Sequence, residues 1–179
     1  MLTRCSVLKS AAAGLALAAL VFVASPRVEA ANPHDIAGTW VTWATIAPGV
    51  QVPILQTFSV DGTFVASDVS MFGGLPGVMI RATPLHGVWE LDRRDMVTTT
   101  GLAMIYDAST SLLAGFIRSR AIGTIGRTGE GEGTVTVEFL PCPTPLTCPD
   151  PLSPDATWVP APGFPPSMTF TTRRLQPME

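Results

Sequence analysis

A histidine and a carboxylate share one face of a predicted strand in the run from Leu85 to Leu91. His86 and Glu90 fall on one face of a strand there, because alternate residues share a face. A histidine beside a carboxylate is a possible acid–base pair. Trp89 falls on the opposite face and is expected to point inward. We therefore predict that His86 and Glu90 face solvent. We name no catalytic residue. His34, the other histidine, is expected to have no role.

Metal and cofactor chemistry have few candidate ligands. Cys142 and Cys148 lie in a proline-rich segment, and a tetrahedral metal would need two ligands more, from a chain with two histidines. We instead predict a disulfide, worth about 2–2.5 kcal/mol in the chain-entropy model. The chain has no Walker loop, dinucleotide fingerprint, HExxH, CxxC or calcium loop. We expect neither a metal nor a cofactor.

A pair of arginines, Arg118 and Arg120, alternates with small residues on another predicted strand. An inward pair could hold a carboxylate ligand. The alternative, which we favour, points both arginines outward and Ser119, Ala121 and Gly123 inward. Small inward side chains leave volume inside a barrel, although they also allow tight packing.

The first 30 residues have the pattern of an export signal. Arg4 and Lys9 precede an uncharged apolar run over residues 11–25, and Val28 and Ala30 supply small residues before a cleavage site. That run is shorter than the roughly 20 residues that span a bilayer. We predict a signal peptide over residues 1–30 and a periplasmic or secreted protein with no membrane span in the mature chain.

The remaining residues, 31–179, have the length of one domain. Removing the signal lowers the net charge from −3 to −5 and takes away the one lysine, Lys9. An acidic domain without a basic run is a poor match for a phosphate backbone, so we expect no nucleic-acid partner.

Helical periodicity is nearly absent from this domain. Short runs rich in β-branched and aromatic residues alternate with turn signals such as Asp61-Gly62. The pattern predicts an all-β fold, an eight-stranded antiparallel up-and-down β-barrel, with a β-sandwich as the alternative. The eight predicted strands cover residues 38–46, 54–60, 63–69, 85–91, 96–106, 115–126, 134–140 and 167–175.

The connections between these strands differ at the two ends of the predicted barrel. The second, fourth and sixth are short and charged, whereas residues 47–53, 70–84, 107–114 and 141–166 form longer, apolar or Pro/Gly-rich connections. This asymmetry predicts a closed base and an open mouth, which is a favoured ligand site. The candidate mouth residues are the apolar side chains of the second long connection, namely Met71, Phe72, Leu75, Met79 and Ile80. The alternative is a loop folded over its own barrel.

The triplet Gly38-Thr39-Trp40 at the first predicted strand resembles the Gly-x-Trp motif of the calycin group of lipocalin-like barrels. The resemblance implies that Trp40 closes the base of the barrel and that a basic side chain near the end of the last strand packs across it. Arg173 and Arg174 are the residues at that position. It also implies binding of a small apolar molecule, without naming one.

Three functions follow from these expectations. The first is an exported barrel that binds a small apolar ligand at its open end. The second is a structural or partner-binding envelope protein with a filled barrel, possible also as an oligomer. The third is a barrel enzyme that resembles cyclases or isomerases. An internal cavity separates the first and third from the second, and a buried charged group inside it favours the third.

Overall fold

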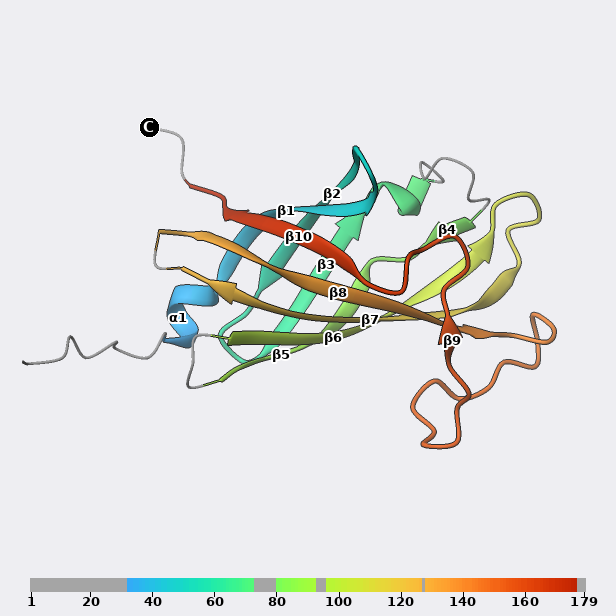
Figure 1. The fold of residues 1–179 in the computed structure, drawn as a ribbon. Coiled ribbons are helices and arrows are strands. Elements are labelled where there is room, and N and C mark those ends of the chain that lie inside the picture. The colour runs from blue at the N-terminus through green and yellow to red at the C-terminus, as the bar shows by residue number, and fades with distance from the viewer. Residues whose placement is uncertain (1–31, 73–79, 93–95, 127, 177–179) are drawn as a thin grey trace, which may run out of the picture.

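The fold is described here from a computed structural model, which covers residues 32–72, 80–92, 96–126 and 128–176. The signal peptide expected over residues 1–30 lies outside this range. The described residues form an all-β barrel with one short helix at one end and one 3₁₀ turn at the other (Figure 1).

Eight strands form a closed antiparallel ring, in the order β10-β1-β2-β3-β5-β6-β7-β8, and β8 pairs with β10 to complete it. This confirms the predicted barrel and rules out the alternative, a β-sandwich. The ring strands are β1 (Gly38–Ala47), β2 (Val50–Phe58), β3 (Thr63–Asp68), β5 (Leu85–Leu91), β6 (Met96–Asp107), β7 (Leu113–Ile125), β8 (Glu130–Pro141) and β10 (Met168–Arg174).

Two short strands were not expected. Strand β4 (Ile80–Ala82) lies in the connection between β3 and β5 and pairs with the end of β6. Strand β9 (Val159–Pro160) pairs with β8 at Glu138 and Phe139, beyond Val135, where the pairing of β8 with the start of β10 stops. Both lie in proline-containing segments without strand periodicity, and both exist because a long neighbouring strand offers them unpaired backbone groups.

The first connection is much shorter than expected. Residues 47–53 were predicted to be a long loop, but β2 begins at Val50, so that only Pro48 and Gly49 separate it from β1. Pro53 lies within the strand, opposite Trp43. Proline is tolerated there because β3 pairs with β2 only from Ile54 onward, which leaves the other side of Pro53 without a partner strand.

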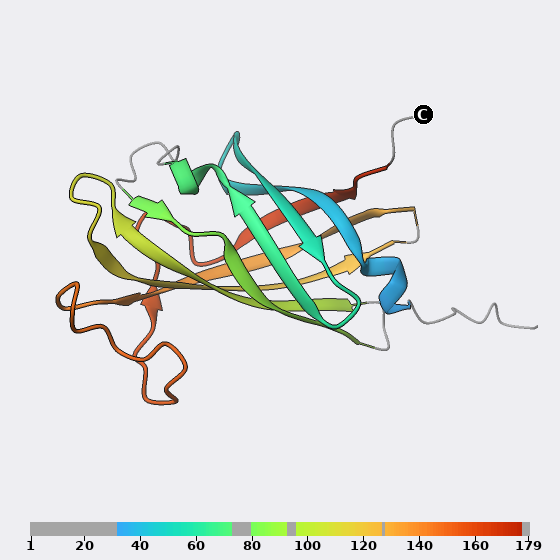
Figure 2. The ribbon, with the colours of Figure 1, turned by 180° about the vertical axis from the view of Figure 1, so that it is seen from behind.

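The base of the barrel is closed by a four-residue helix, α1 (Pro33–Ile36). Asn32 and Asp35 form a reciprocal capping box that holds this turn in place. Ile36 is buried below the barrel, and its carbonyl oxygen accepts a hydrogen bond of 2.8 Å from Nε1 of the fully buried Trp40. Figure 2 shows α1 and the end of β10 at the same end of the barrel.

Arg174 joins the last strand to this base. Its guanidinium lies 6.0 Å from the centre of the Trp40 ring and donates to the carbonyl oxygens of Asp35 and Ala37. Gly38 has φ +134°, and a side chain there would press on the guanidinium. Arg173 instead points outward and forms an exposed ion pair of 2.8 Å with Glu130.

Inside the barrel, two phenylalanine side chains each pack over two glycines on neighbouring strands. Phe64 covers Gly87 and Gly101, which follow it across β3, β5 and β6. Phe170 covers Gly133 and Gly123 in the same way across β10, β8 and β7. The volume that a small residue at position 123 was expected to leave is therefore occupied by Phe170.

Candidate ligand cavity and its mouth

A cavity of about 160 Å³ lies inside the barrel. The packed base forms its floor, where Phe58 and Phe64 stack with ring centres 5.6 Å apart and Trp89 meets Phe58 edge-on. Most of its wall is apolar, and the side chains come from all eight strands of the ring, with Leu85 the one contribution of β5. The apolar wall includes Ala44, Val52, Ile54, Ala66, Ala103, Ile105, Ile117, Ala121, Val135 and Val137.

One group of hydrogen-bonded polar side chains interrupts this apolar wall. The hydroxyls of Thr42 and Thr172 are buried and lie 2.7 Å apart, across the pairing of β1 with β10. The Thr42 hydroxyl also lies 3.2 Å from Oε1 of Gln56 on β2. Uncharged polar groups thus face the cavity from three adjacent strands, and they fix the orientation of one another.

One charged side chain lines the cavity among the described residues, and sequence reasoning did not single it out. Asp68 is the last residue of β3 and follows the inward-facing Phe64 and Ala66 at intervals of two. Its Oδ1 accepts a 2.7 Å hydrogen bond from the backbone N–H of Ser70, at the start of the 3₁₀ turn η1 (Val69–Phe72). The alternation that placed Phe64 inward was enough to place Asp68 inward as well.

The predicted mouth residues are only partly at the cavity. Ile80 lines it, together with Ser70, Ala82 and Thr83 of the same connection. Met71 and Phe72 do not line it, and Phe72 is 83% exposed. Leu75 and Met79 lie outside the described residues. Phe164, from the connection between β8 and β10, lines the mouth instead, although nothing in its proline-rich surroundings indicates this.

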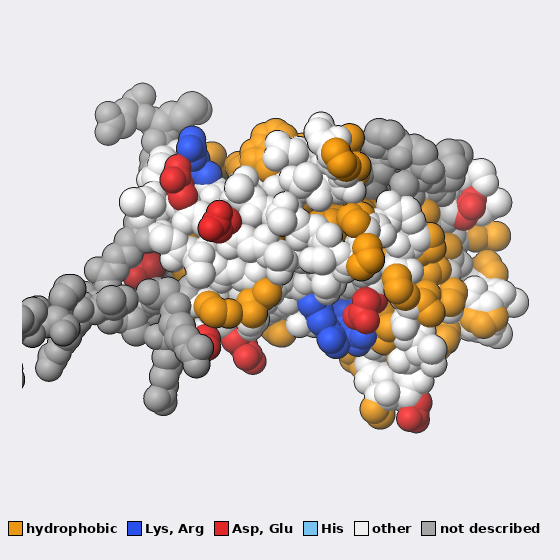
Figure 3. Space-filling view, viewed as in Figure 1, with side chains coloured by type: hydrophobic (Ala, Val, Ile, Leu, Met, Phe, Trp, Pro, Cys, Tyr) orange, Lys and Arg blue, Asp and Glu red, His pale blue; other side chains and the backbone are white. Residues whose placement is uncertain are grey.

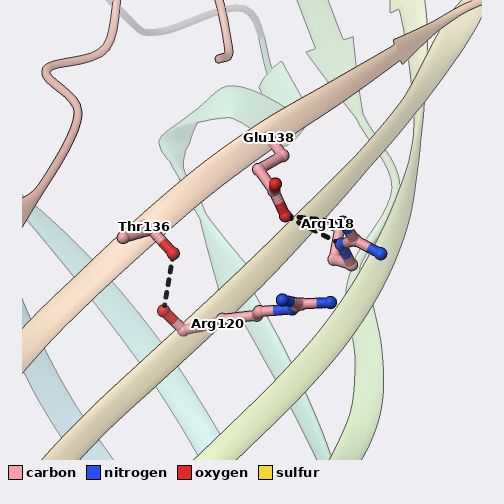
Figure 4. Close-up of polar contacts among 4 residues, drawn as sticks. All are labelled: Arg118, Arg120, Thr136 and Glu138. Atoms are coloured by element: carbon pink, nitrogen blue, oxygen red, sulfur yellow. Dashed lines mark hydrogen bonds and ion pairs between the residues drawn. The ribbon is translucent and has the colours of Figure 1, made fainter. Parts of the chain in front are cut away.

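Arg118 and Arg120 point away from the cavity, as expected, while the alternate residues Ser119 and Ala121 line it. Arg118 forms an ion pair of 2.8 Å with Glu138 on β8 (Figure 4), and its guanidinium lies 4.3 Å from the centre of the Trp158 ring. These contacts hold the segment that carries β9 against the barrel. In the space-filling view, apolar side chains gather toward the mouth end of this face (Figure 3).

His86 and Glu90 are exposed on the outer surface, while Trp89 between them is 5% exposed and part of the core. His34 is exposed on α1. None of the three lines the cavity. Within the part of the chain that the structure describes, no group of three histidine, cysteine or acidic residues is arranged to hold a metal ion.

The predicted disulfide is confirmed. Cys142 and Cys148 are bonded in the loop that follows β8, and the backbone N–H of Cys142 donates to the carbonyl oxygen of Ala114 at the start of β7. The loop projects beyond the mouth end of the barrel (Figure 1), and neither cysteine lines the cavity. The disulfide therefore constrains a mouth loop without forming part of the cavity wall.

The carboxylate of Asp107 organises the connection between β6 and β7. Its Oδ1 accepts hydrogen bonds from the hydroxyl and backbone N–H of Ser109 and from those of Thr110. These hydrogen bonds lower the pKa of Asp107 from its ordinary value of 3.8 to about 2, and the bond from the Ser109 hydroxyl has the largest effect.

We expect the Asp107 carboxyl to titrate near pH 2 in the folded protein, as followed by carbon NMR of the labelled side chain. Because folding lowers this pKa, the stabilisation is present above about pH 3.8 and is lost as the pH falls through about 2. The stability difference between wild type and Asp107→Asn should shrink over that interval. A titration midpoint near 3.8 would show that the loop contacts do not persist in solution.

No helix among the described residues is long and apolar enough to cross a membrane. Comparison of the chain with protein-family models, with curated proteins and with solved structures gives no match. The chain is therefore placed by its architecture, a closed eight-stranded antiparallel β-barrel, and not by a family.

Proposed function

We propose that the protein is an exported binding barrel that holds one small apolar molecule in its central cavity. The observation that carries the proposal is the cavity of about 160 Å³, with a mostly apolar wall and a closed base. A dry cavity of about 150 Å³ is large enough to bind benzene. The fitting ligand is therefore about the size of a single aromatic ring, and smaller than most drug-like ligands.

Export is part of this proposal. The signal pattern over residues 1–30 supports it, and so does the Cys142–Cys148 disulfide, because disulfides persist in oxidising compartments such as the periplasm or the medium. The kinship with calycins suggested by Gly38 and Trp40 also belongs here. It rests on the arrangement of Trp40, Gly38 and Arg174 at the base.

Two other functions remain as alternatives. A partner-binding role draws support from large apolar side chains exposed on the outer wall, including Trp43, Leu55 and Val88, which are 44%, 51% and 55% exposed. An enzymatic role draws support from Asp68 in the cavity. The described lining offers that carboxylate no histidine, cysteine, lysine or tyrosine as a second proton-transfer group, which favours binding over catalysis.

Toluene is a suitable probe of the cavity, because it carries no group that could bind elsewhere by charge. We expect it to bind the disulfide-bonded mature protein and to raise Tm in proportion to the logarithm of its concentration. The Ala121→Leu variant fills the cavity from β7 and should weaken binding about tenfold or more, since protein interiors leave little spare volume. Calorimetry and backbone NMR shifts measure both effects.

Thr134→Leu is the matched control, because Thr134 is exposed on β8 and lies opposite Ile122, the residue that follows Ala121 on β7. It should leave toluene binding unchanged. If the wild type binds neither toluene nor any compound extracted with it from its host, the barrel is filled and the partner-binding alternative takes over. Native mass spectrometry of the exported protein reveals such a co-purifying compound directly.

A further inference from the structure

The single charged side chain among the described residues that line the cavity indicates what kind of ligand the cavity takes. Asp68 lies at the mouth end of β3, on the inner face. Its Oδ1 is engaged by the backbone N–H of Ser70, while Oδ2 has no hydrogen-bond partner or ion pair among the described residues. This half-buried oxygen is not sealed from solvent, so it can take a donor or a cation from a bound ligand.

Gln56 adds a neutral acceptor beside this carboxylate. It pairs with Ala66, two residues before Asp68, so the two inward side chains are diagonal neighbours about 7–8 Å apart at their backbones. The Gln56 amide is oriented by Thr42, whose hydroxyl in turn meets that of Thr172. The polar groups of the cavity therefore extend from the carboxylate at the mouth toward the β1–β10 seam.

We propose that Asp68 makes the cavity selective for small amines, whose ammonium group lies at the carboxylate while the apolar body fills the aliphatic part of the cavity. The inference rests on the proposed binding function and adds the chemical class of the ligand. An ammonium group offers three donors and a positive charge, and it would supply Oδ2 with the partner that the described residues do not. Anions are disfavoured by the same charge.

The position of Asp68 at the mouth makes this pairing feasible. The residue is half-buried, so an ammonium bound to it keeps part of its hydration and avoids the full cost of burying a charge. The cavity volume limits the apolar body to about one aromatic ring or a short branched chain. Benzylamine satisfies both conditions and is the probe of choice, with toluene as its uncharged counterpart.

The test measures the affinities of benzylamine, toluene and benzoate for the disulfide-bonded mature protein by calorimetry at pH 7. We expect benzylamine to bind about tenfold more tightly than toluene, since a charge-assisted hydrogen bond is worth roughly one factor of ten, and benzoate to bind more weakly than toluene. In Asp68→Asn the preference for benzylamine should disappear while toluene affinity stays the same. Asparagine keeps the acceptor oxygen for the Ser70 N–H, so the turn is retained.

Asp61→Asn is the matched control. Asp61 is an exposed aspartate that accepts from the backbone N–H of Thr63 in a similar turn, at the base end of the barrel. This variant changes the net charge by the same amount and should retain the preference for benzylamine. Asp68→Glu, which keeps the charge, should retain a preference as well, and it serves as the second variant if Asp68→Asn does not fold.

The outcomes separate the two claims. Toluene binding with no preference for benzylamine would overturn the amine inference and leave the binding cavity in place. A preference that persists in Asp68→Asn, or that is lost equally in Asp61→Asn, would also overturn it, because net charge rather than Asp68 would then be responsible. Binding of neither probe would overturn the proposed function together with the inference that depends on it.

Discussion

Trp40→Ala is expected to lower the free energy of unfolding by about 4–5 kcal/mol, near the upper end for a buried aromatic residue. The Trp40 side chain is fully buried, its Nε1 holds the carbonyl oxygen of Ile36, and Arg174 lies across its ring. Alanine would remove the contact that joins α1, the first strand and the last strand. For a domain of this size Tm should fall by roughly 10–20 °C, which calorimetry and denaturant titration measure.

The control for this variant is the tryptophan three residues further along the same strand. Trp43 faces outward and is 44% exposed, so Trp43→Ala should cost only about 1 kcal/mol. Both variants remove the same side chain from β1 and differ in which face it occupies. Equal losses of stability would mean that the closed base contributes nothing beyond ordinary strand packing.

Gly87→Ala is the second substitution for which we expect a large effect, a loss of about 3 kcal/mol or more. A Cβ atom at position 87 would overlap the carbonyl oxygen of Thr100 and lie 2.6 Å from Cα of Gly101. Both are backbone atoms of the paired strand β6, so the two strands would have to separate. Urea titration measures the loss, and an unchanged slope with denaturant would show that the compactness of the native and unfolded states is unaffected.

Two further glycine-to-alanine substitutions are expected to cost less stability than Gly87→Ala. At Gly101 the nearest atoms are side-chain atoms of Leu85 and Phe64, which can shift, so Gly101→Ala should cost about 1 kcal/mol. Gly126, in an exposed turn, has its nearest neighbour at 3.3 Å and should tolerate alanine within about 0.5 kcal/mol. The opposite order, with Gly101→Ala the most damaging, would contradict the proposed role of backbone contact.

The closed barrel could be predicted because its signals are local. Alternation within each run sets the inner and outer faces, and turn residues such as Asp61-Gly62 end the strands. The same alternation correctly put Trp89 inside and His86 and Glu90 outside. The number of strands and their antiparallel order follow from these repeated local patterns.

Strand boundaries were less predictable where tertiary pairing overrides local propensity. Gly131 and Gly133 were expected in a turn, but they extend β8 because Thr172 and Phe170 pack over them from β10. Pro53 was expected in a loop and lies in β2, beyond the reach of β3. In each case the deciding partner lies elsewhere in the chain and is invisible to a window of neighbouring residues.

The residues that line the cavity were predicted only in part. Ile80 lines it, Met71 and Phe72 do not, and the lining by Asp68 and Phe164 was missed. Asp68 could have been found by extending the alternation of Phe64 and Ala66 by one step. Phe164 could not, because it reaches the cavity from an irregular proline-rich segment whose path depends on the pairing of β9 with β8.

The hydrogen bond between Thr42 and Thr172 also bears on how the barrel closes during folding. The two residues are 130 positions apart, and the pairings of β10 with β1 and β8 close the ring of strands. Domains dominated by such long-range pairings fold in milliseconds to seconds, because the entropy of closing the chain is lost before the contacts are gained. The Cys142–Cys148 bond spans six residues and does not shorten that search. Without β10 the ring of strands is open between β8 and β1, so an enclosed cavity depends on these two pairings.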